Sequence, residues 1–414
     1  MGAIVRLSDD FVADAPPIPG SVEPSPMQGT ALSSSFVFST MGWTDEAVES
    51  LEFAIYSFRI GNSSIMQFDQ GVLTCPLCEK PDIEWYDTSS SRYWRKVGGL
   101  QLNSWKKLQD DIRMSEGAYV VVARARDHLG AIGETHRFGP KVSPLEGGVG
   151  VEAAEAALIP VLYSAETNRV LNTLNAMVST AFQPSVQEEV VGKVLDALQR
   201  VADFNDLKDD DLLKLGVVVK NLADSGAART TPDTFKTSVS TMKNVVDSVL
   251  YADGADGASL QAGESMLAAI KSLSVIFHDD GTSSSDDRIP NEESRGLTET
   301  LATSACDLAW LVTMRLRAGE SEVYSEEING RGVRQSVSKA MPEAAAAGMS
   351  LFGGGISIAA GSLQPPARRL YHAPSHGIHG GGPCTVGVTQ TEWLANNIYF
   401  WGSSQNIIVK ENQY

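Results

Sequence analysis

Three histidines and a cysteine near the end of the chain have residue types and spacing that could bind a transition metal. His372, His376 and His379 follow one another at steps of four and three residues, and Cys384 comes five residues later. Imidazole and thiolate groups are ligands that Zn²⁺ and Cu²⁺ favour. The many glycines around them are also typical of a plain loop. We therefore expect no metal and no cofactor, with a metal-dependent enzyme as the alternative.

The cysteines could form disulfides or carry redox chemistry. Cys75 and Cys78 have the Cys-x-x-Cys spacing of redox motifs, but they stand between β-type runs and not at the start of a helix. This context favours a local disulfide, with free thiols, a metal site or redox catalysis as alternatives. Cys306 and Cys384 could pair across a long loop, or they could be two buried thiols.

Two further features could mediate recognition at a surface. Asn62 begins the Asn-Ser-Ser sequence of an N-glycosylation site, at a turn where a glycan could stay exposed. The aromatic residues Trp85, Tyr86, Tyr93 and Trp94 could anchor a partner protein or a sugar, since rigid aromatic area binds at low entropic cost. The role that we favour for them is in the core of the predicted sandwich, with partner contact as the alternative.

Charge and motif content narrow the function classes. The formal charge of −18 opposes nucleic-acid phosphates and anionic lipids, so we expect no nucleic acid as a partner. No apolar run reaches the roughly 18 residues that span a bilayer, so we expect no direct membrane insertion. The sequence has no phosphate-binding glycine loop, nucleophile elbow or His-Glu-x-x-His motif, and we expect no enzyme activity.

The elements that would position these residues divide the chain of 414 residues into segments. Residues 1–31 are predicted to be a flexible lead-in, because 15–31 are rich in Pro, Gly and Ser. Residues 32–147 contain short β-type runs typical of an Ig-like β-sandwich. Those runs are 36–38, 51–58, 83–86 and 118–125. In the last, Tyr119, Val121, Ala123 and Ala125 are predicted to share a buried face.

Beyond the glycines at 147–150 the apolar period changes from about two to about 3.6, which predicts a helical bundle over 152–318. Thr231, Pro232 and Asp233 have the residue types of a helix start. Residues 319–414 are predicted to be a small β-rich region. The six predicted helices lie around 171–181, 190–201, 212–222, 235–249, 266–277 and 297–316, and the later β runs lie at 333–337, 356–359, 385–389, 398–401 and 407–409.

Two pieces of the predicted sandwich carry a family resemblance. Residues 34–58 hold a β-type run, then Gly-Trp-Thr-Asp at 42–45, then a second run of alternating apolar residues. Residues 119–134 hold a strand followed by an Asp-x-Leu-Gly-Ala turn at 127–131. In order and spacing these pieces resemble the receptor-for-egg-jelly (REJ) region of the polycystin family.

The resemblance implies a fold and a setting for the whole chain. In such proteins a helical segment and a β region follow, like the adhesion-receptor autoproteolysis-inducing (GAIN) fold, so the implied class is multidomain α+β with a GAIN-like end. That fold cleaves itself at a His-Leu/Ile-Ser/Thr tripeptide, which is missing from 319–414, so we expect no self-cleavage. The family setting is the extracellular face of a cilium or flagellum, an oxidising compartment.

The expected function is that of a non-catalytic structural or adhesion module of a polycystin-like surface protein. Its partners would be other proteins or glycoproteins in a filament or a membrane-linked assembly. The first 20 residues lack the basic start and apolar stretch of a secretory signal, which is consistent either with a piece of a longer product or with a cytoplasmic protein. The alternative function is therefore a soluble intracellular scaffold that docks through its acidic helices.

Overall fold

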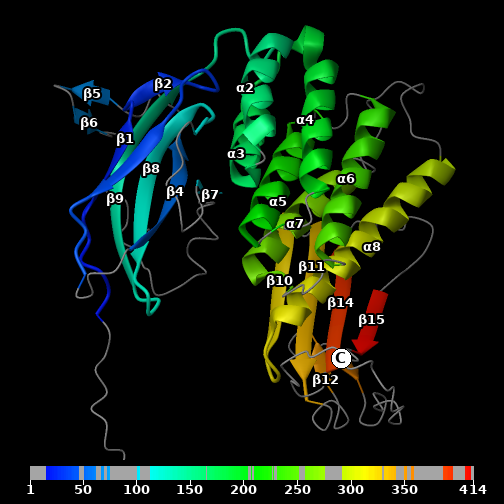
Figure 1. The fold of residues 1–414 in the computed structure, drawn as a ribbon. Helices are drawn as coiled ribbons and strands as arrows, with labels where there is room; N and C mark the ends of the chain where they lie inside the picture. Colours follow the sequence, from blue (N-terminus) through cyan, green and yellow to red (C-terminus); the bar gives the residue numbers. More distant parts are fainter. Residues whose placement is uncertain are drawn as a thin grey trace, which may run out of the picture. The chain divides into compact units, whose positions relative to one another are not determined.

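The computed structural model combines α-helices with several β-sheets (Figure 1). It divides into two compact units, Met1–Glu146 and Gly147–Tyr414. Among its described residues, no helix is both long and apolar enough to cross a bilayer. The structure describes residues 15–45, 51–61, 67–69, 72–74, 100–102, 112–164, 166–203, 207, 209–225, 227, 231–250, 257–275, 291–328, 331–341, 349–351, 356–358, 386–394 and 406–411.

The first unit is built from β-strands. They are β1 (Ser21–Ser25), β2 (Gln28–Thr30), β3 (Val37–Met41), β4 (Glu52–Gly61), β5 (Gln67–Asp69), β6 (Val72–Thr74), β7 (Leu100–Gln101), β8 (Gly117–Arg126) and β9 (Ile132–Ser143). The largest sheet has the order β2-β9-β8-β4-β7, in which only β2 and β9 run parallel. β1 pairs with β3, and β5 pairs with β6.

A single cluster of buried apolar side chains joins the β1–β3 sheet to the five-stranded sheet. Val22 and Phe38 enter it from the two-stranded sheet, and Tyr119, Val121 and Ala123 enter it from β8. The predicted buried face of β8 is confirmed for these three residues. Burial of large apolar side chains at about 1.5–3 kcal/mol each is the main force that holds such layers together.

The opposite face of β8 changes character along the strand. Val120 and Val122 are buried against Phe58 of β4, whereas the side chains of Arg124 and Arg126 reach the surface.

The prediction of a flexible lead-in is wrong for Ser21–Thr30. These residues form β1 and β2, and Val22 and Ala31 are buried in the core. Pro24 sits within β1, which has β3 as its only strand partner among the described residues. A proline is tolerated on such an edge strand because its missing N–H has no ladder partner to lose.

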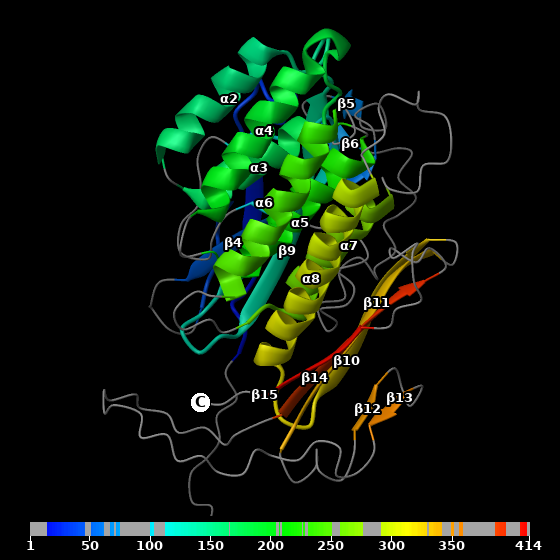
Figure 2. The same cartoon turned by 90° about the vertical axis from the view of Figure 1, so that its right-hand side faces the viewer.

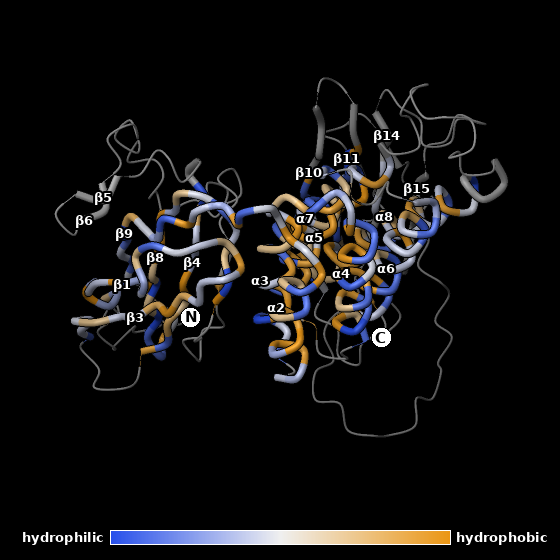
Figure 3. The backbone as a smooth tube through the Cα atoms, turned by 90° about the horizontal axis from the view of Figure 1, so that it is seen from above, coloured by the Kyte–Doolittle hydropathy of each residue, from blue (hydrophilic) through white to orange (hydrophobic). Residues whose placement is uncertain are grey.

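The helices that the structure describes lie in the second unit. They are α2 (Val151–Ser164), α3 (Thr167–Val178), α4 (Gln187–Ala202), α5 (Asp209–Asp224), α6 (Pro232–Leu250), α7 (Leu260–Val275) and α8 (Asn291–Arg315), with a short 3₁₀ turn at Pro184–Val186. The main helix pairs are α5 with α7, α3 with α5, α6 with α8 and α4 with α6. Apolar stretches, orange in Figure 3, occur in these helices.

All six predicted helices are present, and α6 begins as its sequence indicates. Thr231 accepts a hydrogen bond from the backbone N–H of Thr234 through its hydroxyl oxygen, at 3.1 Å, and Pro232 is the first helical residue. A side-chain oxygen in this position satisfies one of the donors that the first helical turn leaves unpaired.

The sequence prediction missed α2. Its buried residues are mostly small, namely Ala154, Ala157, Leu158 and Val161, and Pro160 lies within it. Ile159 and Tyr163 point to solvent on the other side. With apolar residues on both sides and a proline inside, α2 lacks the apolar stripe that marks a helix in sequence.

A four-stranded antiparallel sheet completes the second unit, in the order β10-β11-β14-β15. Its strands are β10 (Ser321–Ile328), β11 (Arg331–Ala340), β14 (Val386–Leu394) and β15 (Asn406–Glu411), and β12 (Met349–Leu351) pairs separately with β13 (Ile356–Ile358). Helix α8 lies against β11 and β14, and α7 lies against β10 (Figure 2). The run predicted at 398–401 lies outside the described residues, and the prediction missed β10 and β12.

Candidate functional site

Most residues that the sequence singled out lie outside the described part of the chain. This holds for Asn62, Cys75, Cys78, Trp85, Tyr86, Tyr93, Trp94, His372, His376, His379 and Cys384. Their proposed roles stay predictions. Cys306 is described, and its side chain is buried in α8. Among described residues, no group of three His, Cys, Asp or Glu side chains is arranged to hold a metal ion.

The turn between β8 and β9 is held together by the side chain of Asp127. One carboxylate oxygen of Asp127 accepts hydrogen bonds from the backbone N–H groups of Leu129 (2.9 Å), Gly130 (2.7 Å) and Ala131 (2.9 Å). Gly130 has φ +94°, a conformation that glycine adopts without strain. These contacts account for the Asp and the Gly of the Asp-x-Leu-Gly-Ala sequence and hold the backbone of Leu129 in place.

Exposed apolar side chains gather at this end of the unit. Leu129 is 66 % exposed, Ile18 66 %, Met41 56 % and Ile132 45 %. Ile18 forms a β-bridge with Thr44, and the carbonyl of Pro17 lies directly against Gly133. Residues 17 and 18 therefore pass beside the turn that joins β8 to β9. We call Ile18, Met41, Leu129 and Ile132 the apolar end.

We expect Asp127→Ala to lower the free energy of unfolding of the first unit by about 1.5 kcal/mol, because three backbone donors lose a charged acceptor at a turn that water can still reach. Asp127→Asn keeps an oxygen in the same place and should lose about half as much. Chemical denaturation followed by tryptophan fluorescence measures both. Equal losses in the two variants would contradict this account of the turn.

Two arginines of β8 near the apolar end, Arg124 and Arg126, form ion pairs with carboxylates. Arg124 donates to Glu134 at 2.8 Å and lies 5.1 Å from the ring centre of Tyr56, and Arg126 pairs with Glu52. Burial raises the pKa of Glu134, and the hydrogen bond from Arg124 acts against that rise. The part of this face that carries Arg124 and Arg126 is therefore charged but internally paired.

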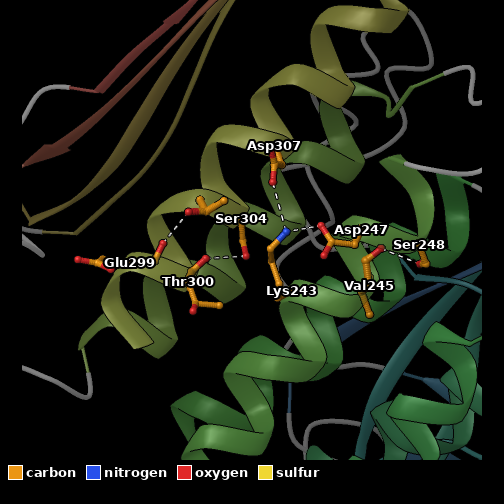
Figure 4. A network of polar contacts seen from close by, with 9 residues as sticks. Lys243, Val245, Asp247, Ser248, Glu299, Thr300, Ser304 and Asp307 are labelled. Atoms are coloured by element: carbon orange, nitrogen blue, oxygen red, sulfur yellow. Dashed lines mark hydrogen bonds and ion pairs between the residues drawn. The ribbon is translucent and has the colours of Figure 1, made fainter. Parts of the chain in front are cut away.

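In the second unit, a lysine joins α6 to α8 (Figure 4). The ammonium group of Lys243 pairs with Asp247 on its own helix and lies 3.4 Å from a carboxylate oxygen of Asp307 on α8. Burial lowers the pKa of Lys243, but the two carboxylates outweigh that effect and raise it overall. The pairs stabilise the charged lysine and fix the relative position of the two helices.

Another lysine of this unit, unlike Lys243, is completely buried. Lys214 of α5 has no exposed surface, and its ammonium group donates to the side-chain oxygen of Asn168 on α3. Burial lowers the pKa of Lys214 to about 8, while Asp211 and Asp210 act in the opposite direction. The sequence prediction gave Lys214 no role, although a lysine next to an apolar stripe and three and four residues after two aspartates was a visible signal.

A third polar cluster lies between α8 and the sheet. The amide nitrogen of Gln335 on β11 donates to the backbone carbonyl of Ala305 on α8 at 2.5 Å and to the hydroxyl of Thr391 on β14 at 3.1 Å. Tyr324 of β10 donates its hydroxyl to the Gln335 side-chain oxygen, and burial holds the pKa of this phenol well above its usual range. One glutamine therefore bonds three strands and a helix together.

The polar clusters and the apolar end differ in their exposure to solvent. Lys214 and Gln335 are enclosed and bind neighbouring elements, whereas the four side chains of the apolar end are exposed, and Leu129 among them lies on a turn fixed by Asp127. An exposed, fixed apolar side chain suits contact with another protein. Compared with protein-family models, with curated protein sequences and with solved structures, the chain shows no match in any of the three.

Proposed function

We propose that the chain is a non-catalytic structural or adhesion module of a polycystin-like protein on the extracellular surface of a cilium or flagellum. It attaches to other proteins or glycoproteins and transmits force between them. The REJ-like pieces of the sequence motivate this proposal, and they include the Asp127 turn whose hydrogen bonds are described above.

Features of the first unit support the Ig-like part of the proposal. β2 runs parallel to β9 at the edge of a sheet that is otherwise antiparallel. Tyr119, near the start of β8, donates its hydroxyl to the backbone carbonyl of Ser115 at 2.9 Å. A tyrosine that bonds back to the preceding backbone at this place is a hallmark of immunoglobulin-type sandwiches.

In the second unit, the order of elements supports a GAIN-like region. A run of helices precedes an antiparallel sheet, and the last helix, α8, lies on β11 and β14. The bonds of Gln335 join that helix to the strands. A sheet joined to its helices in this way can resist tension better than one held by a flexible linker.

The observation that carries the attachment role is the apolar end. Its four side chains are exposed, and the turn that bears Leu129 is fixed before any partner binds. Ordering a loop on binding costs free energy, so a turn already fixed binds more tightly for the same contact area. The neighbouring arginines are paired with carboxylates, which favours an apolar contact over an anionic one.

The test combines location with contact. A photo-crosslinking residue placed at position 129 of the native full-length protein should form an adduct with one defined extracellular protein. The same residue at Ser143, exposed at the other end of β9 from Ile132, is the control and should form none. A membrane-impermeant biotin reagent should label the chain on intact cells. Labelling only after lysis, together with reduced cysteines, would reject the proposal and support the intracellular scaffold.

A further inference from the structure

The interface between α3 and α5 contains a line of polar contacts that the proposed function does not use. At one end Lys214 donates to Asn168. At the other the amide of Asn221 donates to Asn175 and to the hydroxyl of Ser179, both at 3.2 Å. We call these five residues the polar seam. Elsewhere along α3 and α5 the buried residues are mainly apolar.

The seam has matched spacing on its two helices. Asn168 and Asn175 are seven residues apart on α3, and Lys214 and Asn221 are seven residues apart on α5. The two hydrogen-bonded pairs, Lys214 with Asn168 and Asn221 with Asn175, are therefore each separated by 46 residues in sequence. Seven residues are about two helical turns, or about 10 Å. The helices therefore run parallel in one fixed register, and a slip of one turn would break both contacts. Buried polar pairs commonly specify register at a cost in stability.

Within the polar seam, the cost in stability is largest at Lys214. Its side chain is fully enclosed, and the oxygen of Asn168 that accepts its hydrogen bond is neutral. The charges acting on it come from Asp211 and Asp210 of its own helix. Enclosing an ammonium group removes its hydration, and a neutral oxygen only partly replaces it. A neutral amine at the same place would keep a donor for Asn168 without that penalty.

Several other charged groups on the packed elements have partners of their own. Arg169 of α3 pairs with Glu166, Arg315 of α8 pairs with Asp209, and Lys243 of α6 pairs with Asp247. On α7, Glu264 acts on Tyr324 of the sheet, and Lys271 bears the remaining charge. Desolvation raises the pKa of Asp210, although this residue is exposed. Lys214 is therefore the group in the seam whose charge changes near neutral pH.

We propose that the α3–α5 interface is a pH-dependent joint, by which we mean that the two helices separate transiently and that the frequency of separation depends on pH. They separate more often while Lys214 is protonated and less often once Lys214 is neutral. The Asn175–Asn221 contact preserves the register. The joint is independent of the attachment role. It concerns how the second unit opens, whatever the first unit binds.

The direction of the effect follows from the two protonation equilibria. Lys214 has a pKa of about 8 when closed and, once exposed, the usual value of about 10.4. Below the lower value both states carry the proton, so the penalty of enclosure is fully present. Between the two values only the open state stays protonated, so closing becomes more favourable as pH rises. From about pH 7 to about pH 9 the opening constant should fall about tenfold.

Hydrogen exchange of the full chain, expressed as protection factors to remove the intrinsic effect of pH, tests this. Amides of α3 and α5 should gain about tenfold protection between about pH 7 and about pH 9, and those of α8 should change much less. Lys214→Met should abolish the gain. Lys220→Met, at an exposed site on the same helix, is the matched control and should keep it.

Three results would overturn the joint. They are an equal gain in Lys214→Met, no gain in the wild-type chain, and a uniform gain over every helix, which would indicate global unfolding. Should Lys214→Met not fold, the ¹⁵N resonance of the Lys214 side chain in the wild-type protein decides. A titration midpoint near 8 supports the joint, and one above about 10 rejects it.

Discussion

Gln335→Ala should lower the free energy of unfolding of the second unit by about 4 kcal/mol, the largest loss that we expect from a single polar side chain here. Gln335 has no exposed surface and makes hydrogen bonds with Tyr324, Thr391 and the carbonyl of Ala305. Its removal leaves these buried groups without that partner and opens a cavity. Chemical denaturation followed by far-UV circular dichroism gives the value.

Tyr324→Phe is the matched variant, because it keeps the ring and removes one hydroxyl from the same cluster. It should cost about 1.5 kcal/mol. The double variant should lose less than the sum of the two single losses, since both changes break the bond between Tyr324 and Gln335. A loss below about 1 kcal/mol in Gln335→Ala would mean that water replaces the glutamine and that the cluster does not hold α8 on the sheet.

Gly216→Ala should destabilise the second unit by about 2 kcal/mol, even though alanine is the better helix former. A Cβ on Gly216 would lie 2.6 Å from the carbonyl carbon and 2.7 Å from the carbonyl oxygen of Ser265 on α7. Because both are backbone atoms, α5 and α7 would have to move apart. Thermal and chemical denaturation measure the change.

Gly192→Ala provides the control, with the opposite sign. Gly192 lies within α4, and a Cβ there would meet no atom within 4 Å. This variant should gain about 0.5–1 kcal/mol from helix propensity alone. If both substitutions stabilised the protein, the close approach of α5 and α7 would not be required.

Helices with a one-sided apolar stripe could be predicted from the sequence. α4 and α6 are of this kind, with regularly spaced valines and, in α6, a capping threonine. α2 could not be predicted, because it exposes Ile159 and Tyr163 and contains Pro160. Its helical form depends on packing against α3 and α4, which no local pattern records.

The sequence prediction missed strands whose residue types are typical of loops although they lie in sheets. β1 contains a proline and two serines, and β10 contains three glutamates, so both resemble loops in sequence. β1 is held by its pairing with β3 and by burial of Val22, and β10 by its pairing with β11. Strand propensity mainly reflects the partners that a strand meets, and those partners are distant in sequence.

The candidate sites show the same limit. The Asp127 turn is local, and the resemblance to the REJ region pointed to it. The bond from Lys214 to Asn168 joins residues 46 positions apart, and the bond from Gln335 to Ala305 joins residues 30 apart. Contacts of this kind arise only when helices and strands pack, so no spacing rule reveals them.

The parallel pairing of β2 with β9 bears on how the first unit can be produced in isolation. Residues 28–30 bond to residues 141–143, so the beginning and the end of the unit complete one sheet together. A recombinant piece that starts at the first REJ-like residue, Ser34, would leave the N–H and C=O groups along this side of β9 open. Such an edge recruits strands from other molecules, and the shortened piece should precipitate where the longer one remains monomeric.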